Sequence, residues 1–308
     1  MLLMLQTVTA DRFVSFSHKL KEVLSVGNLY APIAECDGII RSRPCGFFSN
    51  FMGVIGLLDR CEKSGRTPTV LFDSGAYYDP GHGPNWWEYF FEPIAPADFR
   101  VVSPFPSLHE QSDADAIRLS YFARDLLSLS RKHELVKKHI KIKPHILEKV
   151  DQFAVKEFNG HYVVGMHLRG TDKVRKEGAV RLPDDYIKKQ IDAILKKRPK
   201  YKIFLATEDS DSLSRMQALF KDRLVFWDST RLSGNPVHAS KGCYGYKIGE
   251  DVLIDCLLLS RCDYLLASIS NVSQCALVFN PRIEHSHFMR FYRNDLFAFR
   301  RYNLSRPS

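Results

Sequence analysis

The stretch Val163-Val164-Gly165-Met166-His167-Leu168-Arg169-Gly170-Thr171-Asp172-Lys173 decides the fold. An apolar, β-branched run predicts a buried strand, and it ends in a cluster of imidazole, guanidinium, carboxylate and ammonium groups. Open α/β sheets bind ligands where strands stop at such loops. Arg169 is suited to a phosphate group, because its planar guanidinium can donate two parallel hydrogen bonds. A solvated turn between a strand and a helix is the alternative interpretation.

The second half of the chain alternates strand-like and helix-like segments. The apolar runs predict strands over 162–168, 201–207, 224–227 and 264–267. Helical spacing predicts helices over 184–197, 212–220, 249–260 and 272–279. Such alternation indicates a parallel sheet with right-handed crossovers.

The first half is a less regular version of this pattern. Its segments predict strands over 38–40 and 67–72, a helix over 13–26, a helix over 47–61 capped by Ser49-Asn50, and helices over 112–149 broken at Pro144. The Gly/Pro-rich segment 77–85 indicates a loop, and the aromatic run 86–91 indicates core packing, with an acceptor-binding surface as the less common alternative. We place the domain boundary near 145–158, which gives an N-terminal α/β domain over 1–155 and a Rossmann-like C-terminal domain over 156–308.

Composition narrows the class of ligand. The 308 residues are 45% hydrophobic and carry a formal net charge of +9, which favours an anionic ligand. The basic residues form no stripe interleaved with aromatic residues, which disfavours nucleic acid, and a smaller anion such as a nucleotide diphosphate suits the charge equally well. The seven cysteines form no CxxC pair, which indicates free thiols in a reducing compartment. With no membrane-spanning stretch or signal-peptide pattern, we expect a cytoplasmic location, although an anchor missing from the sequence is an open alternative.

Polar clusters follow the other predicted strands as well. They are Thr207-Glu208-Asp209, Asp228-Ser229-Thr230 and Ser268-Ile269-Ser270-Asn271. The carboxyl ends of parallel strands line one crevice, so we expect these clusters to lie together. The last cluster begins a helix, whose N-terminus offers N–H groups to a phosphate. Capping by Ser270 or Asn271 is an equally good explanation, and both can hold at once.

Asp255 stands inside the apolar helical run 252–259. A carboxylate there is costly unless it is paired or hydrogen-bonded. It therefore either forms a structural salt bridge or accepts hydrogen bonds from a ligand, for instance from guanine N1–H and its exocyclic amine.

Several other chemistries find little support. The sequence has no HExxH, GxSxG or GxxxxGK[ST] motif, and the acidic pairs Asp113/Asp115 and Asp209/Asp211 stand where helices begin, which favours capping over a metal site. Gly81-His82-Gly83 lacks the third glycine of a dinucleotide fingerprint. His82 and the His285/His287 pair are isolated, so a solvated or core histidine is favoured over a metal ligand.

The segment His167–Val174, followed by Glu177, resembles the signature of the α1,6-fucosyltransferase and protein O-fucosyltransferase superfamily. Segments 204–210, 254–266 and 268–273 resemble its later blocks in order, and 46–50 resembles its first-domain glycine-containing helix start more loosely. The resemblance implies a GT-B fold, with two facing Rossmann-like domains and a cleft between them. It also implies an inverting transfer from GDP-fucose to a glycan hydroxyl without a metal or other cofactor.

The resemblance also implies roles for single residues. Glu177 matches the general base, Lys173 stands beside it, and Arg169 holds the β-phosphate. The residues implied for donor binding are His167, Arg169, Asp172, Asp255, Ser270, Asn271, Ser49 and Asn50. Two positions depart from the animal enzymes: Gly170 replaces a second arginine, and Asn271 replaces a serine.

Two other functions remain open from the sequence. The protein could use another GDP- or UDP-sugar donor on the same fold, or it could be a non-catalytic nucleotide-sugar-binding protein. The expected partners are a nucleotide-sugar donor and a glycan acceptor, with no nucleic acid and no membrane span in this chain. The acceptor and the oligomeric state are not readable from the sequence.

Overall fold

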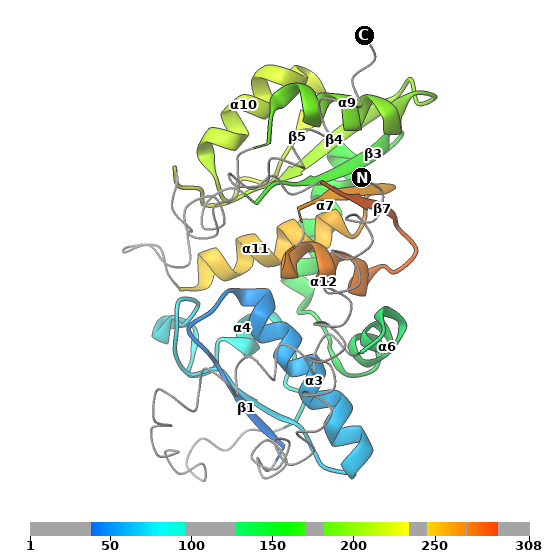
Figure 1. The fold of residues 1–308 in the computed structure, drawn as a ribbon. Helices are drawn as coiled ribbons and strands as arrows, with labels where there is room; N and C mark the ends of the chain where they lie inside the picture. Colours follow the sequence, from blue (N-terminus) through cyan, green and yellow to red (C-terminus); the bar gives the residue numbers. More distant parts are fainter. Residues whose placement is uncertain (1–37, 96–126, 170–181, 234–244, 269, 289–308) are drawn as a thin grey trace, which may run out of the picture. The chain divides into compact units, whose positions relative to one another are not determined.

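The computed structural model describes residues 38–95, 127–169, 182–233, 245–268 and 270–288. Its second half is built on a parallel sheet with the strand order β5-β4-β3-β6-β7 (Figure 1). The strands are β3 (Tyr162–His167), β4 (Tyr201–Ala206), β5 (Leu224–Val225), β6 (Tyr264–Ala267) and β7 (Glu284–His287). The predicted parallel sheet is therefore confirmed.

The strand order contains one reversal of direction. From β3 the chain adds β4 and β5 on one side, then crosses to add β6 and β7 on the other. β3 and β6 are neighbours in register, with Val164 opposite Tyr264 and His167 opposite Ala267. Ligands of open α/β sheets bind at the carboxyl ends of the two strands that flank such a reversal. The fold therefore places the ends of β3 and β6 at the expected ligand position.

Helices cover both faces of this sheet. They are α9 (Asp184–Leu195), α10 (Ser210–Phe220), the 3-10 turn η2 (Lys221–Arg223), α11 (Tyr246–Leu259) and α12 (Asn271–Phe279). Side chains of successive strand residues point to opposite faces, so Val163 joins the core beside α11 and α12, whereas Val164 joins the core beside α9 and α10. Asp209 caps α10 by accepting a hydrogen bond from Ser212 N, which confirms capping for that acidic pair.

Gly165 lets β3 and the end of α11 approach closely. A Cβ atom at this position would lie 2.9 Å from Cys262 Sγ and 3.1 Å from Leu259 Cδ2. Both distances are shorter than ordinary van der Waals contact, so only glycine fits without displacement.

The first half packs against the same core. Its elements are β1 (Ile39–Arg41), α3 (Phe47–Ser64), β2 (Thr69–Leu71), the 3-10 turn η1 (Pro80–His82), α4 (Trp87–Phe90), α6 (Leu129–His139) and α7 (Pro144–Glu157). β1 pairs with β2. Pro144 begins α7 at a position where its missing N–H costs nothing, which confirms the predicted break.

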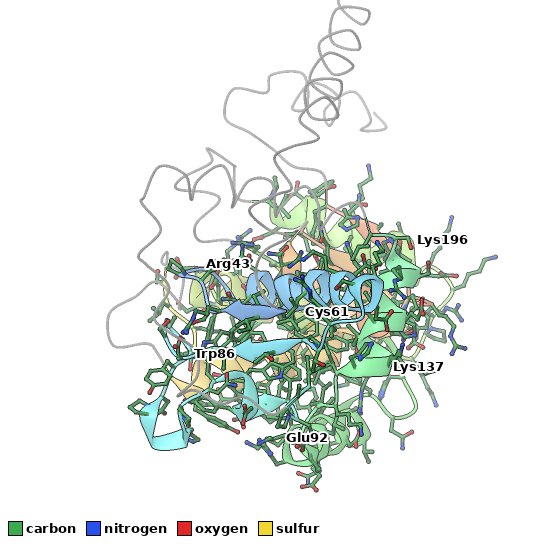
Figure 2. The ribbon with its side chains drawn as sticks, turned by 90° about the horizontal axis from the view of Figure 1, so that it is seen from below. Arg43, Cys61, Trp86, Glu92, Lys137 and Lys196 are labelled. Atoms are coloured by element: carbon green, nitrogen blue, oxygen red, sulfur yellow. The ribbon has the colours of Figure 1, made fainter. Side chains whose placement is uncertain are left out.

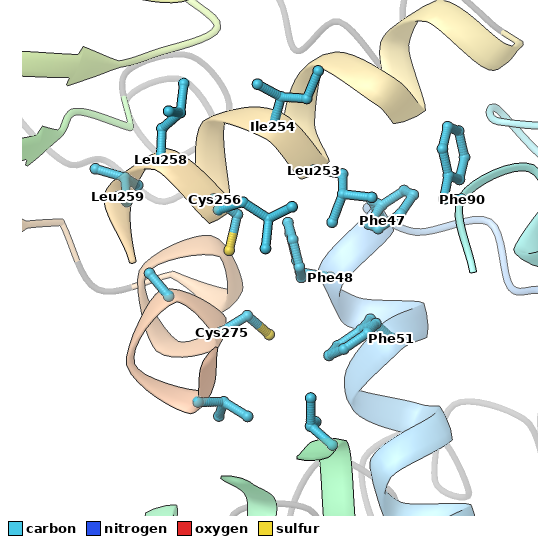
Figure 3. Close-up of a cluster of buried hydrophobic side chains, with 14 of the residues drawn as sticks. Phe47, Phe48, Phe51, Phe90, Leu253, Ile254, Cys256, Leu258, Leu259 and Cys275 are labelled. Carbon is cyan, nitrogen blue, oxygen red and sulfur yellow. The ribbon is translucent and has the colours of Figure 1, made fainter. Parts of the chain in front are cut away.

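Aromatic side chains join α3 to the core of the second half. Phe47, Phe48 and Phe51 lie beside Leu253 and Cys256 of α11 in one buried cluster (Figure 3). Trp86 is 1% exposed, so core packing is confirmed for the aromatic run 86–91. Figure 2 shows Trp86 among packed side chains, whereas the exposed lysines 137 and 196 project outward.

One local prediction needs correction, and one strand of the sheet was not predicted. Ser49-Asn50 does not cap α3, because the helix begins at Phe47 with Gly46 as its N-cap and no side-chain cap. Phe47 N donates instead to Tyr77 Oη (2.8 Å), and Asn50 Oδ1 accepts from Arg43 N (2.9 Å). The edge strand β7 is not predicted from the sequence, because its largely exposed residues carry no apolar pattern.

Some predictions are not tested by the described residues. The helix over 13–26, the start of 112–149 and the acidic pair Asp113/Asp115 lie outside the described residues. The domain boundary near 145–158 falls along α7 and stays a prediction. Within the described ranges, Cys45, Cys61, Cys256 and Cys262 are free thiols. None of the helices in the described part of the chain is long and apolar enough to cross a membrane.

Candidate functional site

The ends of β3 and β6 are joined by hydrogen bonds around His167. Ser268 N donates to His167 O (2.9 Å), and Arg169 N donates to Ser268 Oγ (3.3 Å). Ser270 Oγ lies 3.3 Å from His167 Nδ1. The structure therefore brings together four of the sequence-predicted positions: His167 and Arg169 at the end of β3, and Ser270 and Asn271 at the start of α12.

His167 is a buried, neutral imidazole. Burial and the nearby Arg169 guanidinium lower its pKa to about 4, while a hydrogen bond with Ser268 acts in the opposite direction. A neutral ring has one donor and one acceptor nitrogen, and the contact with Ser270 Oγ engages Nδ1. Arg169, which is half-buried, then supplies the positive charge at this strand end.

Ser270 is the N-cap of α12. Ser273 N donates to Ser270 Oγ (3.3 Å), and Ser270 N donates to Ser273 Oγ (3.2 Å), which makes a capping box. The predicted capping role is confirmed. The first N–H groups of any α-helix lack partners within the helix, and its positive dipole end favours an anion, so capping by Ser270 is compatible with an anion at the start of α12.

Asp255 of α11 is buried, with 7% of its surface exposed. Its Oδ2 accepts a hydrogen bond from Ser229 Oγ (2.9 Å), whereas its Oδ1 has no hydrogen-bond partner among the described residues. Burial raises the pKa of Asp255 to about 7, against the opposing effects of Arg231 and Ser229. No ion pair to Asp255 occurs within the described ranges, so its Oδ1 is a buried acceptor without a partner among the described residues.

The loop after β5 is held against α11 in part by Asp251 and Arg231, which the sequence analysis did not single out. Thr230 donates to Asp251 Oδ2 through its backbone N (2.8 Å) and its Oγ1 (2.9 Å). Arg231 donates to the backbone oxygens of Thr207, Ser229 and Trp227. Asp251 stands one helical turn before Asp255, so its position on the same face of α11 was a readable signal.

The remaining predicted site residues are less closely connected. Asn50 donates to the backbone oxygens of Arg43 and Cys45, and Ser49 O accepts from the Arg43 side chain. Both therefore shape the segment that precedes α3, and donor binding by them stays a prediction. The predicted Asp172, Lys173 and Glu177 lie outside the described residues.

The isolated histidines do not gather into a metal site. His82 stacks on Tyr246 with ring centroids 4.2 Å apart and lies 3.1 Å from Asp79 Oδ2. His285 and His287 lie on β7 with ring centroids 5.7 Å apart. In the part of the chain that is described, no group of three or more His, Cys, Asp or Glu side chains could hold a metal ion.

One protein family matches part of this chain. Residues 133–281 match the family model for alpha-(1,6)-fucosyltransferase N- and catalytic domains. None of the curated protein sequences compared matches this chain. The matched segment contains β3, α11 and the start of α12, so it spans every described element of the candidate site except the start of α3.

Solved structures show the same fold. The NodZ alpha-1,6-fucosyltransferase soaked with GDP-fucose has 20% sequence identity and a TM-score of 0.57, over 79% of this chain and 92% of that chain. The selenomethionine form of fucosyltransferase NodZ from Bradyrhizobium has 19% identity and a TM-score of 0.58, over 82% of this chain and 94% of that chain. The predicted α/β, GT-B fold class is confirmed.

Proposed function

We propose that this glycosyltransferase, whose residues 133–281 match the fucosyltransferase family model, transfers fucose from GDP-fucose to a glycan hydroxyl. The transfer is inverting and needs no metal. The observation that carries the proposal is the convergence of Arg169, neutral His167 and the capped start of α12 at the reversal of strand order. The NodZ structures soaked with GDP-fucose and co-crystallised with GDP support the same donor.

The leaving diphosphate is stabilised by fixed positive groups. As the acceptor oxygen bonds to fucose C1, the bond from C1 to the β-phosphate oxygen breaks, and its electron pair leaves with GDP. Arg169 and the N–H groups at the start of α12 then offset the charge that develops on that phosphate. A metal is not needed for this task, because a guanidinium and a helix N-terminus supply it.

Asp255 recognises the guanine base. Its unpartnered Oδ1 accepts from guanine, whose N1–H and exocyclic amine present adjacent donors. Binding therefore satisfies a buried acceptor that costs free energy in the empty protein. This gives the site a reason to prefer GDP over UDP.

The acceptor hydroxyl must also lose a proton. We propose that the Glu177 carboxylate accepts that proton and that Lys173 lies beside it, as the family resemblance implies. Asp172 contacts the donor. Ser49 and Asn50 complete the donor side from the start of α3. Residues 1–155 then form the acceptor-side domain, and residues 156–308 the donor-binding domain that contains the whole parallel sheet.

A nucleotide and nucleotide-sugar panel tests the proposal. Thermal unfolding is measured with GDP, UDP and ADP, and free-nucleotide release is measured from GDP-fucose, other GDP-sugars and UDP-sugars, with and without EDTA. We expect GDP alone to raise the melting temperature, since only a ligand of the native state stabilises it. Release from GDP-fucose in EDTA, dependent on a glycan acceptor, is the expected activity.

Other outcomes identify the alternatives. Stabilisation by UDP, or release from a different sugar, indicates the same fold with another donor. Nucleotide binding without release or transfer indicates a non-catalytic binding protein. Activity that EDTA abolishes contradicts the metal-independent mechanism.

A further inference from the structure

Two carboxylates of α11 face the loop that follows β5. Asp255 accepts from Ser229, and Asp251, one helical turn earlier, accepts twice from Thr230. Both carboxylates are buried, with 7% and 3% of their surfaces exposed. Consecutive loop residues are thus bonded to consecutive turns of one helix.

Arg231 holds the same loop from its other side. Its guanidinium donates to Thr207 O (3.1 Å), Ser229 O (2.8 Å) and Trp227 O (2.6 Å), which ties the loop to the end of β4. Next along the chain, Leu232 N donates to Glu208 O (3.0 Å). The loop is therefore fixed between α11 and the end of β4.

We propose that Asp251, acting through Thr230, is a positioning residue that holds Ser229 on one oxygen of Asp255 and thereby keeps the other oxygen for the guanine base. This inference rests on the proposed function. Ser229 fixes the orientation of the carboxylate by occupying Oδ2, which leaves Oδ1 as the acceptor without a protein partner. A loop free to move would let Ser229 leave or let the carboxylate rotate, and discrimination between bases would fall.

The test is a double-mutant cycle on nucleotide affinity. Thr230→Val and Ser229→Ala are made singly and together, Asp251→Ala is made alone, and the Kd values of GDP and inosine diphosphate are measured by calorimetry. Inosine diphosphate lacks the exocyclic amine, so the ratio of the two Kd values reports contact with that edge of the base. We expect each single variant to weaken GDP binding about tenfold and to lower the ratio of the inosine diphosphate Kd to the GDP Kd. The double variant should bind GDP no more weakly than the weaker-binding single variant.

Lys188→Ala is the matched control. The Lys188 ammonium contacts the carboxylate of Asp192, one turn along α9 (2.6 Å), and takes no part in the bonds of Asp251, Thr230 or Asp255. We expect it to change GDP affinity by less than about twofold. Additive effects of Thr230→Val and Ser229→Ala, or an equal loss for both nucleotides, overturn the positioning role, because a merely structural contribution produces that pattern.

A ligand-free measurement separates this inference from the proposed function. If the native protein does not bind GDP, the proposed function fails, and the positioning role is then tested by carboxyl NMR titration of Asp255. The charged groups that act on Asp255 are Arg231, Asp251 and Lys247, and Thr230→Val alters none of them. A higher pKa of Asp255 in Thr230→Val, from loss of the Ser229 bond, is the expected result; an unchanged titration overturns the inference.

Discussion

The Ser270 hydroxyl lies 3.3 Å from His167 Nδ1, although 103 residues separate the two positions in the chain. The contact follows from the pairing of β3 with β6, which places the ends of both strands at one edge of the sheet. It fixes a neutral imidazole between a strand end and the start of α12. The geometry of the proposed phosphate site thus depends on a buried side chain that must stay uncharged.

Acid is expected to destabilise the protein through His167. Its pKa is about 4 in the folded protein against an ordinary 6.5, so the unfolded chain binds the proton more tightly. Stability contributed by neutral His167 is complete above pH 6.5 and is lost as the pH falls towards 4, by about 3 kcal/mol at most. Urea unfolding of His167→Gln between pH 4 and 8 should show a shallower acid loss than the native protein.

His161→Gln is the control for that measurement. His161 contacts a backbone oxygen of its own turn, so His161→Gln removes an imidazole from the chain without touching the candidate site. Parallel stability curves for His167→Gln and the native protein would contradict the buried, neutral imidazole.

Asp255→Asn is expected to separate stability from binding. The pKa of Asp255 is raised to about 7 from 3.8, so the folded state holds the proton more tightly, and stability is lost as the pH rises through 7. At pH 8 the neutral amide avoids a buried charge and should stabilise the ligand-free protein by about 2 kcal/mol or more. It should also weaken stabilisation by GDP, because a neutral amide oxygen is a weaker acceptor for the guanine donors than the charged Oδ1.

Thermal unfolding at pH 8 with and without GDP checks both halves of this expectation. In the native protein, GDP affinity should also fall as the pH drops below about 7, since protonated Asp255 loses acceptor capacity. An Asp255→Asn protein that is less stable at pH 8, yet bound by GDP as tightly as the native protein, would refute the assignment.

Arg169→Ala and Arg169→Lys should differ from each other. Alanine removes the positive charge at the end of β3 and should lower kcat/KM by about 100-fold or more with the fold intact. Lysine keeps the charge without the planar pair of donors, so we expect an intermediate loss. Steady-state GDP release measures both variants, and Arg261→Ala, which breaks an ion pair with Asp151, serves as the control. Native-like activity in Arg169→Ala would exclude the diphosphate contact.

The sequence predicted the sheet well because its signals are local. Apolar runs such as 162–168 and 201–207 identify buried strands, and the polar clusters after them identify the ligand edge. β7 escaped because an exposed edge strand needs no apolar residues. The Ser49-Asn50 cap was wrong because the competing partner, Tyr77, lies thirty residues away and no local rule reveals it.

Part of the site was equally hidden from the sequence. Asp255 stood out as a carboxylate in an apolar helix, and the structure adds that one of its oxygens is bonded to Ser229. Arg231 gave no such signal, because an arginine in a loop is usually solvated. Its three backbone acceptors come from two strand ends, and only the tertiary structure brings them within reach.

Two glycine-to-alanine substitutions should have opposite effects on stability. In Gly165→Ala the new methyl group would lie 2.9 Å from Cys262 Sγ and 3.2 Å from Cys262 Cβ, with Leu259 also too close. β3 or the end of α11 must then move, which should cost about 1–3 kcal/mol. In Gly56→Ala, within α3, the methyl group would meet only the end of the Arg60 side chain at 3.7 Å.

Because alanine favours the helix over glycine, Gly56→Ala should stabilise the protein by about 0.5–1 kcal/mol. Urea unfolding of both variants measures the contrast under identical conditions. Since β3 carries His167 and Arg169 at its end, Gly165→Ala should also weaken GDP binding, whereas Gly56→Ala should leave it unchanged. Equal stability of the two variants would mean that β3 does not approach α11 as closely as the packing around Gly165 requires.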